Sequence, residues 1–324
     1  MEALTRLRRP LRRPASGRQA LNERPLDPSW ERPDLWQLFQ LYKVCMARVE
    51  VEMPDKTLAN GAAFHIGDGY MVTARHVIED SQVTEIVAEH SRPKALTIVR
   101  TFVPDDPKVD LAILETDFSL ELYMERTTIV RDDFVQPKIA YVPLGGHLDD
   151  WIGDELVLTS VLAMGYPRVP LSADTQLVAS VGEINGVVDR YDGGHPHFIV
   201  STMGRGGFSG GPVIHEWNFL LGIYTGIFSE DLERTGGFPA VLSIEPLLVL
   251  MHENGIFPGE NGRMLRELIS DEPIEDLLRP NIRGDADFDP LIAADHARRE
   301  LIARKRAANP RYRPHDGTGG PEAW

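Results

Sequence analysis

The chain is short of cysteine, of long apolar runs and of positive charge. Its 324 residues include a single cysteine, Cys45, so no disulfide can form within the chain. Secreted proteins of this size often carry several disulfides, so this composition indicates a reducing compartment. No apolar stretch approaches the roughly 18 residues that a membrane-spanning helix needs. We therefore expect a cytoplasmic protein that does not act at a membrane, with Cys45 as a small core residue.

The charge balance argues against nucleic acid as a partner. The formal net charge is −15, and an acidic surface repels a phosphate backbone. The balance is uneven, because the first twenty residues carry six arginines and one acid. No hydrophobic run follows them, so they do not read as a secretory signal. We expect residues 1–34 to form a disordered basic arm, with organellar import as a minority alternative.

The remaining sequence is apolar enough to fold, at 42% hydrophobic residues, and its pattern is that of an all-β protein. Val49, Val51 and Met53 alternate with charged residues, which indicates a half-buried strand. Further short apolar runs lie between turn residues. They are Ala62–Ile66, Tyr70–Thr73, Leu96–Phe102, Leu111–Glu115, Glu155–Met164, Gln176–Val181, Phe198–Thr202, Pro212–His215 and Phe219–Ile227. A helix is expected at Glu245–Asn254, and after Pro258 the chain becomes charged and only partly helical.

The segment around Ser209 has the composition that a nucleophilic serine needs. Glycines flank it in the run Gly206–Val213, which reads GGFSGGPV. They let the backbone turn sharply and let a substrate carbonyl approach the N–H groups of Gly207 and Ser209, the candidate oxyanion hole. A Gly-rich loop without function is the competing interpretation of this motif alone.

Two further motifs supply the partners of such a serine. An apolar strand leads into His76, and Asp110 precedes a second apolar run at Leu111. A carboxylate beside buried surface stays ionised only with a partner, and the His76 ring N–H would serve. Either residue alone would more often be structural.

In the order His76, Asp110, Ser209, the three motifs resemble the trypsin-like serine peptidases, and among them the bacterial HtrA (Deg) catalytic domain. The resemblance covers roughly residues 40–250 and is carried by 61–64 with 69–77, 110–114, 163–167, 207–213 and 221–223. It implies two six-stranded antiparallel β-barrels, about 40–150 and 151–244, closed by a helix at 245–254. It also implies a cleft between the barrels that needs no cofactor or metal.

The resemblance implies a serine endopeptidase that cleaves polypeptides through an acyl-enzyme. By the family pattern, Met203 and Tyr224, Thr225 and Gly226 would line the pocket for the side chain before the cut. None of them is acidic, so we expect apolar rather than basic side chains there.

The chain departs from the family pattern in three places. Phe208 stands where the family has Asp or Asn, the stretch Phe118–Asp154 is long enough for a gating loop, and residues 259–324 leave no room for a PDZ domain. We divide the chain into the arm 1–34, a peptidase domain 35–258, and an extension 259–324 that is a candidate site for a regulatory protein partner.

Two alternatives remain open from the sequence. Gly207–Gly211 also satisfies G-x-S-x-G, the nucleophile elbow of α/β-hydrolases, in which Asp231 and His252 would complete a triad. That fold needs a helix after the serine, and Gly210-Gly211-Pro212 is poor helix material. A catalytically silent trypsin-like protein that only binds peptides is the second alternative.

Overall fold

A computed structural model describes residues 33–79, 82–88, 95–118, 130–131, 134–135, 141–144, 156–188, 195–228 and 237–271. The basic arm up to residue 32 and the extension beyond residue 271 lie outside these ranges, as does most of the stretch Phe118–Asp154. Within that stretch, β7 (Val130–Arg131) and β8 (Phe134–Val135) pair with each other.

The first of two six-stranded antiparallel sheets is a half-barrel with the order β4-β1-β2-β3-β6-β5. Its strands are β1 (Met46–Glu52), β2 (Leu58–Gly67), β3 (Tyr70–Thr73), β4 (Gln82–Val87), β5 (Ile98–Phe102) and β6 (Ala112–Thr116). Apolar residues alternate along β1 and point toward one interior.

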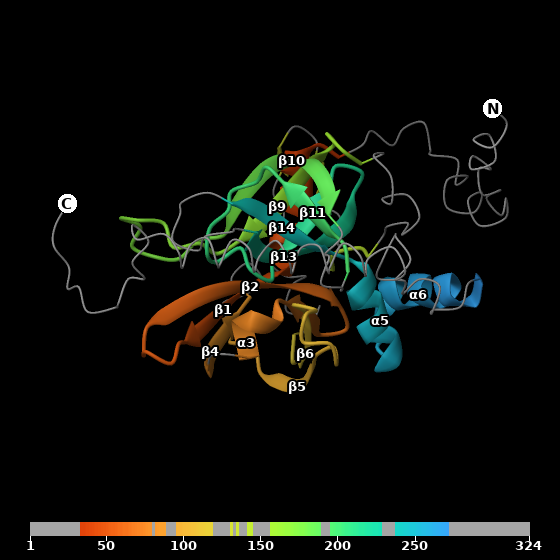
Figure 1. Cartoon of the computed structure of the whole chain (residues 1–324), viewed down its shortest axis with the longest axis horizontal. Helices are drawn as coiled ribbons and strands as arrows, with labels where there is room; N and C mark the ends of the chain where they lie inside the picture. Colours follow the sequence, from red (N-terminus) through yellow and green to blue (C-terminus); the bar gives the residue numbers. More distant parts are fainter. Residues whose placement is uncertain are drawn as a thin grey trace, which may run out of the picture.

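The second sheet is a closed barrel with the order β10-β11-β14-β13-β12-β9. Its strands are β9 (Ser160–Gly165), β10 (Val178–Val188), β11 (His197–Val200), β12 (Pro212–His215), β13 (Phe219–Phe228) and β14 (Phe238–Ser243). The predicted trypsin-like double barrel is thereby confirmed. Figure 1 shows the closed barrel above the half-barrel.

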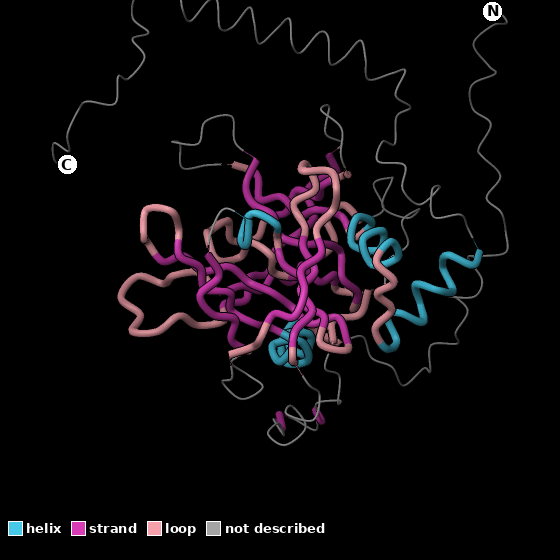
Figure 2. The backbone as a smooth tube through the Cα atoms, turned by 90° about the horizontal axis from the view of Figure 1, so that it is seen from below, coloured by secondary structure: helices cyan, strands magenta, loops and turns pink. Residues whose placement is uncertain are grey.

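Among the described residues, five helical elements join or border the sheets, and Figure 2 shows the helices around the strands. They are α2 (Leu35–Tyr42), η1 (Lys43–Cys45), α3 (Arg75–Glu79), α5 (Glu245–Glu253) and α6 (Gly259–Asp271). The helix expected at Glu245–Asn254 is therefore present as α5. Within the described ranges, no helix has both the length and the apolar character needed to cross a membrane.

Each sheet encloses its own apolar cluster, and a third and larger cluster lies between the sheets. That third cluster combines Phe64 and Ile113 of the half-barrel with Met164 and Ile223 of the closed barrel. Buried residues of α2, α5 and α6 complete it, and Cys45 is fully buried in it. The two sheets therefore share a core, which holds the edges that face each other in fixed positions.

The strands β4 and β14 and the helices α2 and α3 were not predicted from the sequence. In β4, exposed and half-buried residues precede a buried Ile86-Val87, so no period-2 pattern develops. In β14, Pro239 argues against a strand, but it lies opposite Ile227 at the exposed end of the ladder. The start of α2 could have been predicted from the sequence, because Asp34 and Gln37 form a capping box there.

Candidate active site

The pairing of β3 with β6 brings His76 and Asp110 together. Thr73 at the end of β3 lies opposite Ala112 at the start of β6. His76 follows Thr73 by three residues, and Asp110 precedes Ala112 by two. Both residues therefore lie beyond the same end of the sheet. His76 lies in the short helix α3, one turn beyond the strand that the sequence placed before it.

Both carboxylate oxygens of Asp110 hold His76. Oδ2 lies 2.7 Å from the ring Nδ1, and Oδ1 accepts the backbone N–H of His76 at 2.9 Å. An ionised carboxylate only accepts hydrogen bonds, so Nδ1 carries the proton and Nε2 holds the lone pair of the neutral ring. The imidazole is 45% exposed, which leaves it within reach of a substrate.

The loop that carries Asp110 is fixed on both sides. Val109 and Leu111 are buried, so the aspartate is held between two anchors in the core. The neighbour of His76, Arg75, donates to the carbonyl of Pro104 at 3.1 Å and binds Glu79 through two nitrogens at 2.6 and 2.7 Å. The segments that carry His76 and Asp110 are thus tied to each other outside the histidine–aspartate bond as well.

The loop around Ser209 requires glycine at two positions. Gly207 has a φ of +97°, and a Cβ there would lie 2.4 Å from the carbonyl oxygen of Tyr166. Gly210 has a φ of +82°, and a Cβ there would lie 2.3 Å from both the carbonyl oxygen of Ala62 and Oγ1 of Thr73. Only glycine combines left-handed backbone with so close an approach of neighbouring chain.

Both sheets hold this loop. The carbonyl of Ser209 accepts the N–H of Ala62 in β2 at 2.8 Å. On the other side, the N–H of Gly210 donates to the carbonyl of Tyr224 in β13 at 2.8 Å. A Cβ on Gly210 would also come within 2.7 Å of the N atom of Ala74, two residues before His76. The Ser209 loop therefore adjoins the segment that carries His76.

The two proposed oxyanion donors are open. Within the described part of the chain, the N–H groups of Gly207 and Ser209 have no hydrogen-bond acceptor. The intervening carbonyl and amide groups are engaged, since Gly207 accepts from Tyr166 at 2.8 Å and Phe208 donates to Arg205 at 3.3 Å. Two neighbouring free amides beside a serine can stabilise a negative oxygen.

Phe208 anchors the loop in the closed barrel. Its side chain is fully buried in the barrel's apolar cluster, with its ring 5.8 Å from that of Tyr224. Hydrophobic burial therefore fixes the residue before Ser209, where the resemblance led us to expect Asp or Asn.

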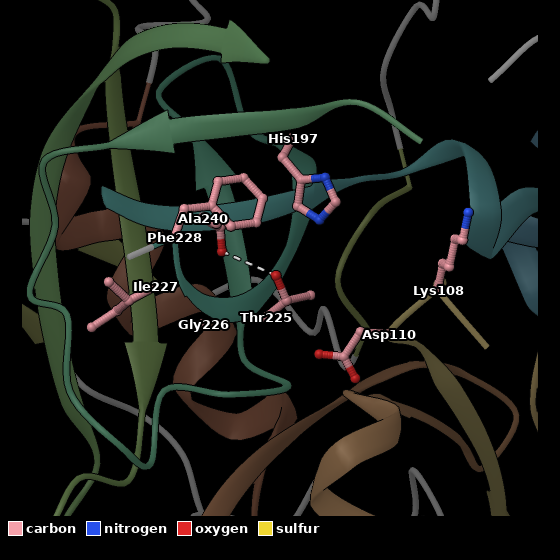
Figure 3. A pocket seen from close by; sticks show the side chains of 8 residues that line it. All are labelled: Lys108, Asp110, His197, Thr225, Gly226, Ile227, Phe228 and Ala240. Carbon is pink, nitrogen blue, oxygen red and sulfur yellow. Dashed lines mark hydrogen bonds between the residues drawn. The ribbon is translucent and has the colours of Figure 1, made fainter. Parts of the chain in front are cut away.

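The residues predicted for the substrate pocket separate into two groups. Thr225 and Gly226 line a shallow cavity of about 180 Å³ beside Asp110, shown in Figure 3. Tyr224 is buried in the barrel, where burial raises the pKa of its hydroxyl to about 12, and its OH donates to the carbonyl of Met203 at 3.4 Å. Met203 is 43% exposed and does not line this cavity.

The cavity has further walls that the sequence did not reveal. They are Lys108, His197, Ile227, Phe228 and Ala240. They come from the loop before β6 and from β11, β13 and β14. Oγ1 of Thr225 donates to the carbonyl of Ala240 at 3.3 Å across the β13–β14 pair. Of these residues, Lys108 could have been suspected from the sequence, because it lies two residues before Asp110. Among the described residues, no group of three His, Cys, Asp or Glu side chains could hold a metal ion.

The double barrel and the edge where His76, Asp110 and the Ser209 loop meet define a chymotrypsin-type peptidase architecture. A family model described as "Trypsin-like peptidase domain" matches residues 61–223, which is half of the chain. The protein therefore belongs to the trypsin-like peptidase domain family. No curated protein gave a significant match.

Several solved structures are similar to the chain at low identity. The serine endoprotease from Yersinia pestis is 19% identical, with a TM-score of 0.45, over 68% of this chain and 65% of that one. The HtrA-type protease AlgW with a tripeptide is 18% identical, with a TM-score of 0.47, over 68% and 63%. The active form of the Rv3671c protease from M. tuberculosis is 19% identical, with a TM-score of 0.45, over 69% and 87%. The chain thus spans less than two thirds of the first two relatives.

The α/β-hydrolase alternative does not fit this architecture. The strand β12 follows Ser209 directly, where a nucleophile elbow would require a helix. His252 lies in α5, and Asp231 lies outside the described residues.

Proposed function

We propose that the protein is a serine endopeptidase that hydrolyses polypeptides through Ser209, His76 and Asp110. The observation that carries the proposal is the double contact between Asp110 and His76 at the edge where the Ser209 loop joins the two sheets. This contact sets the tautomer in which Nε2 of His76 can take a proton from a hydroxyl.

In the first half of the reaction, Nε2 of His76 removes the proton from Oγ of Ser209 while Oγ attacks the peptide carbonyl carbon. The carbonyl oxygen becomes negative, and the N–H groups of Gly207 and Ser209 stabilise it. The tetrahedral species collapses as His76 gives its proton to the leaving amine, and an acyl-enzyme remains on Ser209. Asp110 stabilises the transient imidazolium and keeps the ring in place.

In the second half, His76 removes a proton from a water molecule that attacks the acyl carbon. The same two amides stabilise the second oxyanion, and His76 returns the proton to Oγ of Ser209. The acid product leaves and the free enzyme is restored.

A fluorophosphonate probe tests the proposal directly. The probe forms a covalent bond only with an activated serine, and intact-mass spectrometry shows the adduct. We expect one adduct per chain in the native protein, at Ser209 by peptide mapping, and none in Ser209→Ala or in protein unfolded in urea. A native, folded protein that stays unlabelled and cleaves no casein would support the silent peptide-binding alternative instead.

A further inference from the structure

Leu171 occupies an unfavourable position for a leucine on two counts. It is the third residue of the turn Val169–Ser172, in which the N–H of Ser172 donates to the carbonyl of Val169 at 3.1 Å. Leu171 has a φ of +68° and follows Pro170. This is the arrangement of a type II turn, whose third position favours glycine. Its side chain is also fully exposed, at 107%. Neither the backbone nor the burial of apolar surface explains a leucine here.

The turn lies on a loop that is fastened to the site at both ends. We call residues 166–175 the β9 exit loop, because it directly follows β9. At its start, the N–H of Tyr166 donates to the carbonyl of Gly207 at 2.8 Å. At its end, Oγ1 of Thr175 accepts from Nδ2 of Asn60, on β2 of the half-barrel, at 3.1 Å. The loop therefore runs from the Ser209 loop of one sheet to the facing strand of the other.

The strand order puts this loop on a definite side of Ser209. β12, which begins three residues after Ser209, lies between β9 and β13 and is antiparallel to both. β9 and β13 therefore both end near Ser209, on opposite sides of it. The end of β13 carries Thr225 and Gly226, which line the cavity beside Asp110 and which the family resemblance assigns to the side chain before the cut. A polypeptide that crosses Ser209 from that side leaves past the β9 exit loop.

We propose that Leu171, together with the half-exposed Val169, contacts the substrate residues that follow the scissile bond and favours apolar side chains there. The proposal rests on the proposed peptidase function and adds a preference on the leaving-group side. An exposed leucine at the rim loses contact with water when an apolar substrate side chain covers it, and a serine in the substrate gains nothing from it. Leu171 would contact the part of the substrate that is released when the acyl-enzyme forms. The contact therefore acts on substrate binding and acylation, which determine kcat/KM.

The chain offers a matched control in Leu158. Leu158 also has a left-handed backbone, with a φ of +67°, and is 69% exposed. It lies in the turn Leu156–Thr159, before the first residue of β9, whereas Leu171 follows its last. The six residues of β9 separate the two turns by roughly 20 Å. If replacing any exposed, strained leucine changed the peptide preference, both substitutions would change it. If the change comes from contact with the substrate, only the substitution of Leu171 should have this effect.

The test uses two quenched-fluorescent peptides that share the residues before a mapped casein cleavage site and carry Leu-Leu or Ser-Ser after it. For the wild type we expect kcat/KM to favour the Leu-Leu peptide by about tenfold. In Leu171→Gly and Leu171→Ser the ratio should fall to near one, with kcat/KM for the Ser-Ser peptide unchanged. Leu158→Gly should keep the wild-type ratio. Circular dichroism melting checks the fold, and glycine at either turn should not lower Tm.

Binding to the Ser209→Ala background separates this proposal from the peptidase assignment. Fluorescence anisotropy of the same peptides, labelled and uncleaved, should show tighter binding of Leu-Leu, and Leu171→Gly should abolish the difference. If the wild type cleaves neither peptide, the peptidase assignment fails, and the anisotropy ratio still decides the role of Leu171. A ratio that is equal in the wild type and in Leu171→Gly, in cleavage and in binding, overturns the proposal.

Discussion

Asp110 is the residue whose chemistry can be removed with the least change of shape. In Asp110→Asn the amide can turn its NH₂ toward Nδ1 of His76, which then holds the wrong tautomer for a base. We expect kcat on a casein substrate to fall on the order of 10³- to 10⁴-fold, with KM little changed. Ser209→Ala should lose at least as much. Asp106→Asn is the matched control, because Asp106 lies on the same loop and its carboxylate accepts the backbone N–H of Lys108 at 2.9 Å. A Ser209→Ala protein that cleaves casein at the wild-type rate would refute the assignment.

His215 links the stability of the closed barrel to pH. It is fully buried, its ring stacks on Phe219 at 4.6 Å, and burial lowers its pKa to about 4. Its Nδ1 accepts the N–H of Trp217 at 3.1 Å, so Nε2 carries the proton and donates to Oγ1 of Thr159 at 2.8 Å. A second proton would point Nδ1–H at another N–H, which the folded barrel disfavours.

The sign of the pH effect follows from that lowered pKa. Above about pH 6.5 the histidine is neutral in both states, and its full contribution to stability is present. As the pH falls from about 6.5 to about 4, the unfolded chain binds the proton first, and roughly 3 kcal/mol of unfolding free energy is lost. Urea unfolding at several pH values measures this slope. His215→Gln should be less stable at pH 7 and show a flatter slope. Burial also lowers the pKa of His195 to about 4, so part of the slope should remain.

The helix α6 belongs to the folded body, although the sequence ended the domain at Pro258. Asn261 is 3% exposed, and its Nδ2 donates to the carbonyls of Ile66 and Val142 at 2.7 and 2.9 Å. Its Oδ1 accepts the N–H of Leu144 at 2.9 Å, and Leu265 is fully buried one turn later. One side chain thus satisfies three backbone groups of two distant segments.

Removing that side chain should destabilise the whole domain. Asn261→Ala leaves two carbonyls and one amide without partners, at a cost of roughly 3 kcal/mol or more in the free energy of urea unfolding. Glu267→Gln on the exposed side of α6 should change it by less than about 0.5 kcal/mol. For the same reason, we expect a chain that ends at Pro258 to have a much lower melting temperature than a chain that ends at Asp271. Equal melting temperatures would restore the boundary at Pro258.

In the proposed mechanism, the two sheets together supply every group that the reaction needs, without a metal ion. The half-barrel would supply the base and its partner, and the closed barrel the serine and the two amides. These groups generate the nucleophile and stabilise the oxyanion without a Lewis acid. Casein cleavage should therefore be unchanged after dialysis against EDTA, with a zinc peptidase treated in parallel as the control for chelation. Complete loss of activity that zinc restores would contradict the serine mechanism.

What the sequence determines by itself is the local chemistry of the site. Gly207 and Gly210 stand where the backbone is left-handed and crowded, and no other residue fits, so the motif around Ser209 was readable in advance. Strands such as Tyr70–Thr73 and Pro212–His215 were predicted at the observed bounds, because uninterrupted apolar runs between turn residues signal burial. The order His76, Asp110, Ser209 then indicated the double barrel.

What only the tertiary structure decides is which distant segments meet. The strand β14 contains a proline and forms because its partners β11 and β13 close the barrel around it. The cavity beside Asp110 joins Lys108, His197 and Thr225, and Asn261 fastens α6 to Ile66 across nearly two hundred residues. A local pattern records how far each residue tends to be buried and how freely its backbone can turn. It does not record the partner, because pairing depends on the register and packing of strands far apart in the chain.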